Sequence, residues 1–260
     1  MSILETAIRR SIGLVVGDQR RRVISQNYNA LRRILLPKRE KEQHLLPNLI
    51  GKDGVAFEIG ANYGQYLTDL APLVGPKGHV HAFEPAEITF DCLQRICRIK
   101  RLTNVSLNHA ALSNKVGTAV LHTPIKDSGT FGVAKASLSP GTDMEHSSET
   151  IHLDTLDRYV EERGLDRIDL IRCDVEGSEY NVLLGGRETF TRFRPLVLME
   201  IHPGLLKRFD QDEMAILKYF QDLDYRAFEL ENGQLVETDK FVTENYFFFP
   251  EERVEAILQA

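Results

Sequence analysis

The residues with the clearest chemical potential in this 260-residue sequence follow short apolar runs, where β-strands are expected to end. Acids stand after four of the five expected strands, at Glu58, Glu84, Asp174 with Glu176, and Glu200. In an open α/β sheet, ligands bind beyond the carboxyl ends of the strands. Solvent also places charged residues at strand ends, but acids at four strand ends in the same crevice favour a site for a cationic or hydroxyl-bearing ligand.

Two glycines follow the first of these acids in the segment FEIGANYG, residues 57–64. Gly60 and Gly64 allow a tight turn and close approach to a ligand, but the GxGxxG spacing of dinucleotide loops is absent. A dinucleotide needs the middle glycine to admit its pyrophosphate. S-adenosylmethionine (SAM) has no phosphate, and its ammonium and sulfonium suit an acidic crevice. Glu84 lies 20 residues after Gly64, where an acid binds ribose hydroxyls in nucleoside-binding α/β folds.

From residue 55 onward, short apolar runs alternate with helix-length segments, which predicts a mainly parallel sheet with helices on both faces. The last two expected strands, RAFEL and YFFFP, have no helix between them and are expected to pair antiparallel at an edge. Residues 118–122 are interpreted as an extension of the third strand. The polar stretch 123–150 is typical of a lid or acceptor-binding loop.

Residues 1–50 are predicted to form an N-terminal helical cap, and 51–260 the main domain.

Charge and cysteine content narrow the class of protein. The net charge of −6 gives no reason to expect a nucleic-acid-binding protein. Residues 1–50 hold 10 Lys and Arg against 4 acids, which is explained most simply by a solvated helical face. The alternatives are contact with an anionic membrane, with a partner or with the acidic surface of the chain itself, and a homodimer through these helices is also considered. Three cysteines without a CxxC pair fit a reducing cytoplasm. No segment approaches the roughly 20 apolar residues of a spanning helix.

Six segments together resemble the FkbM family of SAM-dependent methyltransferases. They are FEIGANYGQY, HVHAFEPAEITFDCLQ, NVSLNHAALSNKVGTAVL, LDTLDRY, IDLIRCDVEGSEYNVLLGG and RPLVLMEIH. The resemblance covers roughly residues 53–203, and its most specific parts are the AFEP and DVEGSE blocks. It implies the class I methyltransferase sheet, which is Rossmann-like and has seven mostly parallel strands with a reversed terminal hairpin.

The resemblance also implies roles for the residues that match the family's motifs. The glycine loop would surround the methionine part of SAM, Glu84 would hold the ribose, the AAL segment would pack near adenine, and Asp174 would face the methionine end or the reaction centre. These cofactor-binding residues are Glu58, Gly60, Asn62, Gly64, Glu84, Ala110, Ala111 and Asp174. Tyr63 and Tyr66 are further candidates to flank the cofactor, with core packing at helical spacing as the alternative. Glu58 replaces a frequent aspartate of the family, and Arg172 a frequent lysine.

The implied activity is methyl transfer from SAM to a hydroxyl of a sugar, glycolipid or secondary metabolite. A hydroxyl must lose its proton during attack, which requires a base or a metal ion. We expect His202 to be the general base, because histidine titrates nearest neutrality, with Glu200 or Glu176 orienting it or the acceptor. The competing version has Asp174, Glu176 and His202 binding a divalent cation. An NAD-dependent oxidoreductase and a non-catalytic SAM-fold binding module are the alternative functions.

Overall fold

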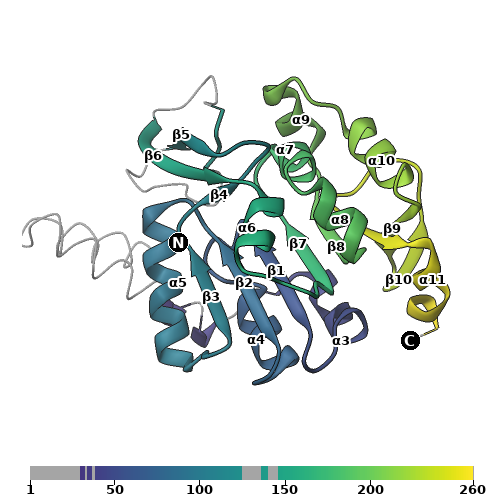
Figure 1. Cartoon of the computed structure of the whole chain (residues 1–260), viewed down its shortest axis with the longest axis horizontal. Helices are drawn as coiled ribbons and strands as arrows, with labels where there is room; N and C mark the ends of the chain where they lie inside the picture. Colours follow the sequence, from purple (N-terminus) through teal and green to yellow (C-terminus); the bar gives the residue numbers. More distant parts are fainter. Residues whose placement is uncertain (1–29, 33, 37–38, 125–135, 140–145, 260) are drawn as a thin grey trace, which may run out of the picture.

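The computed structural model describes residues 30–32, 34–36, 39–124, 136–139 and 146–259 (Figure 1). Eight strands form the main sheet: β1 (Val55–Ile59), β2 (His79–Phe83), β3 (Val105–Asn108), β7 (Leu170–Cys173), β8 (Leu196–Glu200), β9 (Tyr225–Glu231), β10 (Gln234–Glu237) and β11 (Asn245–Pro250). Their order is β10-β9-β11-β8-β7-β1-β2-β3. The five strands from β8 to β3 pair in parallel. The predicted mostly parallel sheet is therefore confirmed, with β10 as an additional strand.

The antiparallel pairing expected for RAFEL and YFFFP is confirmed, because β11 pairs antiparallel with β9, but β10 rather than this pair forms the edge of the sheet. Strand β11 is antiparallel to both β8 and β9 and lies between them. The turn at residues 231–234 joins β9 to β10, which is the edge strand. The apolar run of β11 explains this placement, because its residues from Tyr246 to Phe249 are fully buried and suit a central strand better than an edge.

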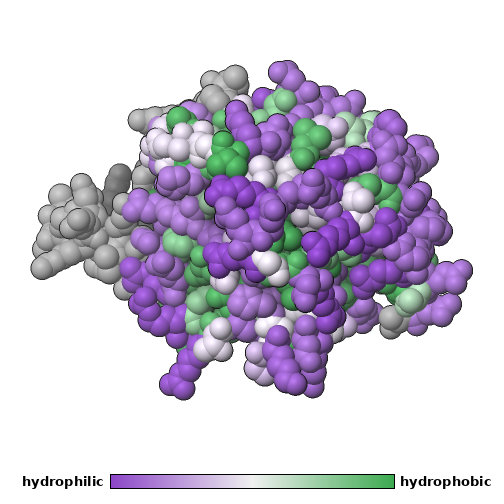
Figure 2. Space-filling model, viewed as in Figure 1, coloured by the Kyte–Doolittle hydropathy of each residue, from purple (hydrophilic) through white to green (hydrophobic). Residues whose placement is uncertain are grey.

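Helices cover both faces of the sheet and bury two apolar cores. One core contains residues of α6 (Leu156–Glu162), α7 (Glu179–Leu184), α8 (Arg187–Phe193) and α10 (Glu213–Gln221). The other contains residues of α3 (Leu46–Leu49), α4 (Leu67–Val74), α5 (Glu87–Lys100) and α11 (Glu251–Leu258). Side chains alternate between the cores along each strand, so Phe57 packs in the first and Ala56 in the second. The face in Figure 2 is mostly hydrophilic, with only small apolar areas between the polar side chains.

A second, three-stranded sheet lies beside the main one. It consists of β4 (Ala111–Leu112), β5 (Gly117–Pro124) and β6 (His146–Asp154) in the order β4-β6-β5. The interpretation of residues 118–122 as an extension of the third strand is wrong, because they pair with β6 in this small sheet. The two ends of the polar stretch 123–150 also belong to β5 and β6. In Figure 1 this hairpin projects from the upper left of the main sheet.

The expected N-terminal cap falls mainly outside the described residues, since 1–29 are not among them. The expected homodimer contact through these helices therefore stays a prediction. Ala30 is buried against Cys92 and Ile96 of α5. The segment from residue 39 continues through the 3₁₀ helix η1 (Lys41–Leu45) and α3 along the main sheet. Within the described part of the chain, no helix is long and apolar enough to cross a membrane.

Candidate active site

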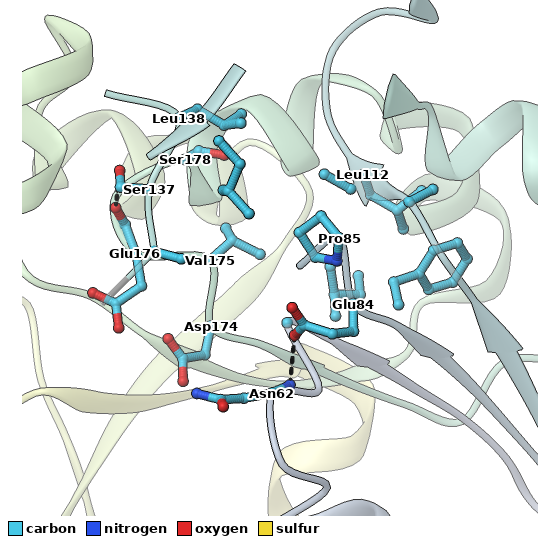
Figure 3. A pocket seen from close by; sticks show the side chains of 17 residues that line it. Asn62, Glu84, Pro85, Leu112, Ser137, Leu138, Asp174, Val175, Glu176 and Ser178 are labelled. Atoms are coloured by element: carbon cyan, nitrogen blue, oxygen red, sulfur yellow. Dashed lines mark hydrogen bonds between the residues drawn. The ribbon is translucent and has the colours of Figure 1, made fainter. Parts of the chain in front are cut away.

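A pocket opens where β1, β2 and β7 end, next to the small sheet (Figure 3). Figure 3 shows Asp174 and Glu176 on one side and Glu84, Pro85 and Leu112 on the other. The residues that line it are Ile59, Gly60, Asn62, Phe83, Glu84, Pro85, Ala110, Ala111, Leu112, Leu121, Ala136, Ser137, Leu138, Asp174, Val175, Glu176 and Ser178. Strands that end at the same edge of a parallel sheet therefore bring together most of the residues expected from the sequence.

The loop after β1 turns sharply at Gly60, where φ is +82°. A Cβ atom at this position would lie 1.8 Å from the carbonyl oxygen of Asp174, so only glycine fits. The amides of Gly60 and Ala61 both donate to the carbonyl oxygen of Phe83, at 3.0 and 2.9 Å. Asn62 also has a positive φ of +49°. The two hydrogen bonds tie the glycine loop to the end of β2, and the close approach of Gly60 to Asp174 places the loop against the end of β7.

Glu84 is buried and held by three donors. Its Oε1 accepts from the amide of Ala86 at 2.9 Å and from the hydroxyl of Thr89 at 2.7 Å. Its Oε2 accepts from the amide of Asn62 at 2.7 Å. Burial raises the pKa of Glu84 to about 7, against the opposing effect of these hydrogen bonds. Because each carboxylate oxygen has about two acceptor positions, Oε2 retains one for a ligand in the pocket.

Asp174 is paired with Arg172, whose side chain is only 6% exposed. The Nη2 atom of Arg172 donates to Oδ2 of Asp174 at 2.7 Å. Burial opposes the charge of Arg172, but Asp174, Tyr66 and Glu58 together raise its pKa above the ordinary value. Asp174 keeps about a fifth of its side-chain surface exposed and lines the pocket, with Arg172 beside it as a counter-charge.

Glu200 and His202 lie farther from the pocket, and neither lines it. Oε2 of Glu200 is 3.9 Å from Nη2 of Arg172, and the Glu200 side chain is 27% exposed. Burial, followed by the nearby charge of Asp174, raises the pKa of Glu200 to about 8. His202 is exposed at the residue before α9 (Pro203–Leu206). The expected group of acids and histidine is thus divided, with Asp174 and Glu176 at the pocket and the other two beyond it.

Three residues of the predicted cofactor loop do not line the pocket. Glu58 is buried in β1, one residue before the end of the strand. Tyr63 packs against the cluster that contains Cys92 and Ile96. Gly64 has a φ of +71°, and a Cβ there would lie 2.8 Å from Cδ2 of Leu93. These three residues therefore pack within the protein around the turn, whereas Gly60 and Asn62 line the pocket.

Sequence reasoning named no residue in the stretch 136–139, which forms part of the pocket wall. Ser137 pairs with His122 of β5 through backbone hydrogen bonds in both directions, at 2.8 and 3.0 Å. Its hydroxyl donates to the carbonyl oxygen of Glu176 at 3.3 Å. Leu138 packs with Leu121 in a small apolar cluster. The only signal in the sequence was the length and polarity of the stretch 123–150, which indicated a binding loop but no individual residue.

The residues that line the pocket match the parts of SAM in their chemistry. The remaining acceptor position of Glu84 suits a ribose hydroxyl. An apolar wall that suits adenine is formed by Pro85, Ala110, Ala111, Leu112 and Leu121. Asp174 and the turn at Gly60 lie beside the position left for a cationic tail. The charged residues among the lining are Glu84, Asp174 and Glu176, so the described wall is acidic.

A metal-ligand set does not emerge from the described residues. Nowhere in 39–124, 136–139 or 146–259 do three His, Cys, Asp or Glu side chains come together as a metal ion would need. The set considered from the sequence, Asp174, Glu176 and His202, is not among such groups: the two acids line the pocket and His202 does not.

The strand order and the pocket after β1, β2 and β7 define a class I methyltransferase fold. A crystal structure of methyltransferase FkbM from Methylobacillus flagellatus has the same fold, with a TM-score of 0.50 and 17% identity, over 77% of this chain and 45% of that chain. Residues 58–227 match the model of the methyltransferase FkbM domain. This chain belongs to the FkbM methyltransferase family, which confirms the resemblance seen in the sequence.

Two curated relatives share part of their length with this chain. The 2-O-methyltransferase NoeI of Sinorhizobium fredii is 30% identical over 153 residues, 55% of this chain and 61% of NoeI. The hexuronic acid methyltransferase AglP of Haloferax volcanii is 28% identical over 154 residues, 59% of this chain and 58% of AglP. The chain thus spans about three fifths of the length of these relatives.

Proposed function

We propose that this chain is a SAM-dependent O-methyltransferase that acts on a hydroxyl of a sugar, glycolipid or secondary metabolite. Membership of the FkbM family supports methyl transfer and weighs against an NAD-dependent oxidoreductase. The names of NoeI, a 2-O-methyltransferase, and AglP, a hexuronic acid methyltransferase, support a hydroxyl of a sugar as the acceptor. The free thiols of Cys92, Cys97 and Cys173 fit action in a reducing cytoplasm.

The orientation of Glu84 carries the assignment of the cofactor. Three donors fix its carboxylate and leave one acceptor position on Oε2 toward the pocket. A carboxylate held this way suits a ribose hydroxyl, and the apolar wall from Pro85 to Leu121 suits the attached base. When bound, SAM supplies an electrophilic methyl group on a positively charged sulfur. The residues of this chain then have to orient the acceptor oxygen and take up its proton.

Substitution of Glu84 tests the cofactor assignment. Glu84→Ala is expected to weaken SAM binding by about 1.5–3 kcal/mol, the usual range for a hydrogen bond to a charged group. Isothermal titration calorimetry measures this change directly. Glu87→Ala is the matched control, because Glu87 is exposed on the first turn of α5 and does not line the pocket. Unchanged affinity in Glu84→Ala would show that Glu84 does not bind the cofactor.

We propose His202 as the general base, with Glu200 or Glu176 orienting it or the acceptor. The exposed position of His202 next to Glu200 at the end of β8 leaves its ring accessible to an acceptor that enters from solvent. Glu200 is the second candidate for the base, because burial raises its pKa to about 8 and a base functions best when its pKa lies near the working pH.

Turnover on an acceptor sugar distinguishes these versions. His202→Ala is expected to lower kcat by roughly 10²–10⁴-fold with little change in SAM affinity. A chelator is expected to leave turnover intact, whereas loss of activity on chelation would favour the divalent-cation version. If His202→Ala retains near-wild-type turnover and Glu200→Gln does not, Glu200 is the base.

A further inference from the structure

Arg172 connects two residues of the pocket wall to the layer beneath it. Its Nη2 donates to Asp174 at 2.7 Å, and its Nη1 donates to the carbonyl oxygen of Gly60 at 3.4 Å. Gly60 and Asp174 both line the pocket, and their backbones are in contact. Because the guanidinium is almost fully buried, protein groups rather than water determine where it lies. Arg172 therefore helps to fix this part of the wall, together with the backbone hydrogen bonds from Gly60 to Phe83 and from Asp174 to Ile59.

Tyr66 supports Arg172 from the side away from the pocket. The Cζ atom of Arg172 lies 4.6 Å from the centroid of the Tyr66 ring, within the range of a cation–π contact. Tyr66 is fully buried, and its hydroxyl donates to Oε2 of Glu40 at 2.9 Å. A buried hydroxyl that loses its acceptor costs free energy, so Glu40 fixes the orientation of the ring.

Glu40 is itself held in place by the start of α4. Its Oε1 accepts from Nε2 of Gln65 at 2.5 Å, and its backbone amide donates to Oε1 of Gln43 at 2.7 Å. The Nε2 atom of Gln43 donates to the carbonyl oxygen of Gln65 at 3.2 Å and to Oδ2 of Asp69 at 2.9 Å. Glu40 lies outside the range 58–227 that matches the family domain.

We infer that Glu40 is a positioning residue for the cofactor loop. Through the hydroxyl of Tyr66 and the guanidinium of Arg172, it holds Gly60 and Asp174 in the conformation that the pocket requires. This role rests on the proposed function, because the ligand of the loop is SAM or its demethylated product, S-adenosylhomocysteine (SAH). The segment that precedes the family domain thus contributes to cofactor binding without touching the cofactor.

Two measurements on the full chain test this role. The first is SAH affinity by calorimetry, and the second is hydrogen exchange of residues 58–64 in the ligand-free protein. Glu40→Ala is expected to weaken SAH binding at least about fivefold and to speed hydrogen exchange in residues 58–64. The reason is that it removes the acceptor of the Tyr66 hydroxyl, on which the contacts through Arg172 to Gly60 depend. Exchange in the β9–β10 hairpin, residues 225–237, is expected to be unchanged, because the hydrogen bonds of Glu40 go to Gln43, Gln65 and Tyr66 and not to this hairpin.

Matched variants separate positioning from a general loss of structure. Glu40→Gln keeps an acceptor for Tyr66 and is expected to stay within about threefold of the wild-type affinity. Arg39→Ala removes an exposed ion pair with Asp69 from the same segment and is expected to have no effect on affinity. Tyr66→Phe removes the same hydrogen bond as Glu40→Ala. The double variant is therefore expected to bind SAH no more weakly than whichever single variant has the lower affinity.

The outcomes distinguish this role from the proposed function. Unchanged SAH affinity and unchanged exchange in 58–64 for Glu40→Ala would overturn the role of Glu40. A lower melting temperature with equally faster exchange in 58–64 and 225–237 would also overturn it, since Glu40 would then be merely structural. If wild-type protein binds no SAH, the cofactor assignment fails, and the exchange measurement still decides whether Glu40 positions the loop.

Discussion

Glu84 combines a buried carboxylate with a pKa near neutrality, so its state of ionisation changes in the pH range where enzymes work. Burial raises its pKa to about 7. Only the ionised form presents acceptors on both oxygens, because a protonated oxygen becomes a donor. The amides of Asn62 and Ala86 favour the ionised form, and a ribose hydroxyl would favour it further.

SAH binding is therefore expected to tighten as the pH rises from 6 to 8. The binding energy that depends on the Glu84 carboxylate is absent well below a pKa of about 7 and present above it. Calorimetry at pH 6, 7 and 8 measures the change. Glu84→Gln removes the titrating group and is expected to flatten this dependence. The same slope in both proteins would assign the titration to another group.

At the scale of elements, the glycine loop depends on the close contact between the ends of β1 and β7. Gly60→Ala would place a Cβ 1.8 Å from the carbonyl oxygen of Asp174 and force a positive φ on alanine. We expect a loss of at least about 1–3 kcal/mol of stability and loss of measurable SAH binding. Gly51→Ala is the control, because no atom lies within 4 Å of the added Cβ. Thermal denaturation and calorimetry of both variants check this. Equal melting temperatures and equal SAH affinities in the two variants would contradict the close contact.

The elements that could be predicted from the sequence are those with local signals. Glu84 and Asp174 each follow an apolar run directly, so their place at the sheet edge follows from the strand pattern alone. The small sheet could not be predicted in this way, because β4 pairs with β6 across a distance of about 40 residues in sequence and β4 has only two residues. The contacts from Glu40 through Tyr66 to Arg172 join three distant segments, and their side-chain directions depend on burial rather than on periodicity.

At the scale of the whole molecule, several buried groups make stability depend on pH in two opposite ways. Burial raises the pKa values of Glu84 and Glu179 to about 7 and of Glu200 to about 8. These groups bind a proton more tightly in the folded state, so their contribution is full only below the ordinary pKa of 4.5 and is lost progressively as the pH rises from there through 7 and 8. Burial lowers the pKa of His81 to about 3 and also lowers that of His79, so stability falls as the pH drops below about 6.5.

Above pH 6.5 the two histidines are mostly neutral in both the folded and the unfolded state, so the three acids determine how the stability of the ligand-free protein changes with pH. Between pH 6.5 and 8.5, the free energy of unfolding should fall by on the order of 1–3 kcal/mol, with the partly exposed Glu200 contributing less than its pKa alone implies. Urea denaturation across this range measures the change. Glu179→Gln should reduce the slope, because Glu179 is buried and accepts from the amides of Val175 and Gly177. A free energy of unfolding that rises between pH 6.5 and 8.5 would contradict the raised pKa values assigned to Glu84, Glu179 and Glu200.

The position of β11 between β8 and β9 has a consequence for synthesis on the ribosome. Every strand that precedes it is complete before residue 245 emerges, yet β8 and β9 cannot be joined until the last strand is available. During translation, the nascent chain therefore carries two unpaired strand edges, each able to pair with another chain. A polypeptide that ends before residue 245 would keep every residue that lines the pocket but leave the facing edges of β8 and β9 unpaired, so we expect it to self-associate rather than to remain monomeric.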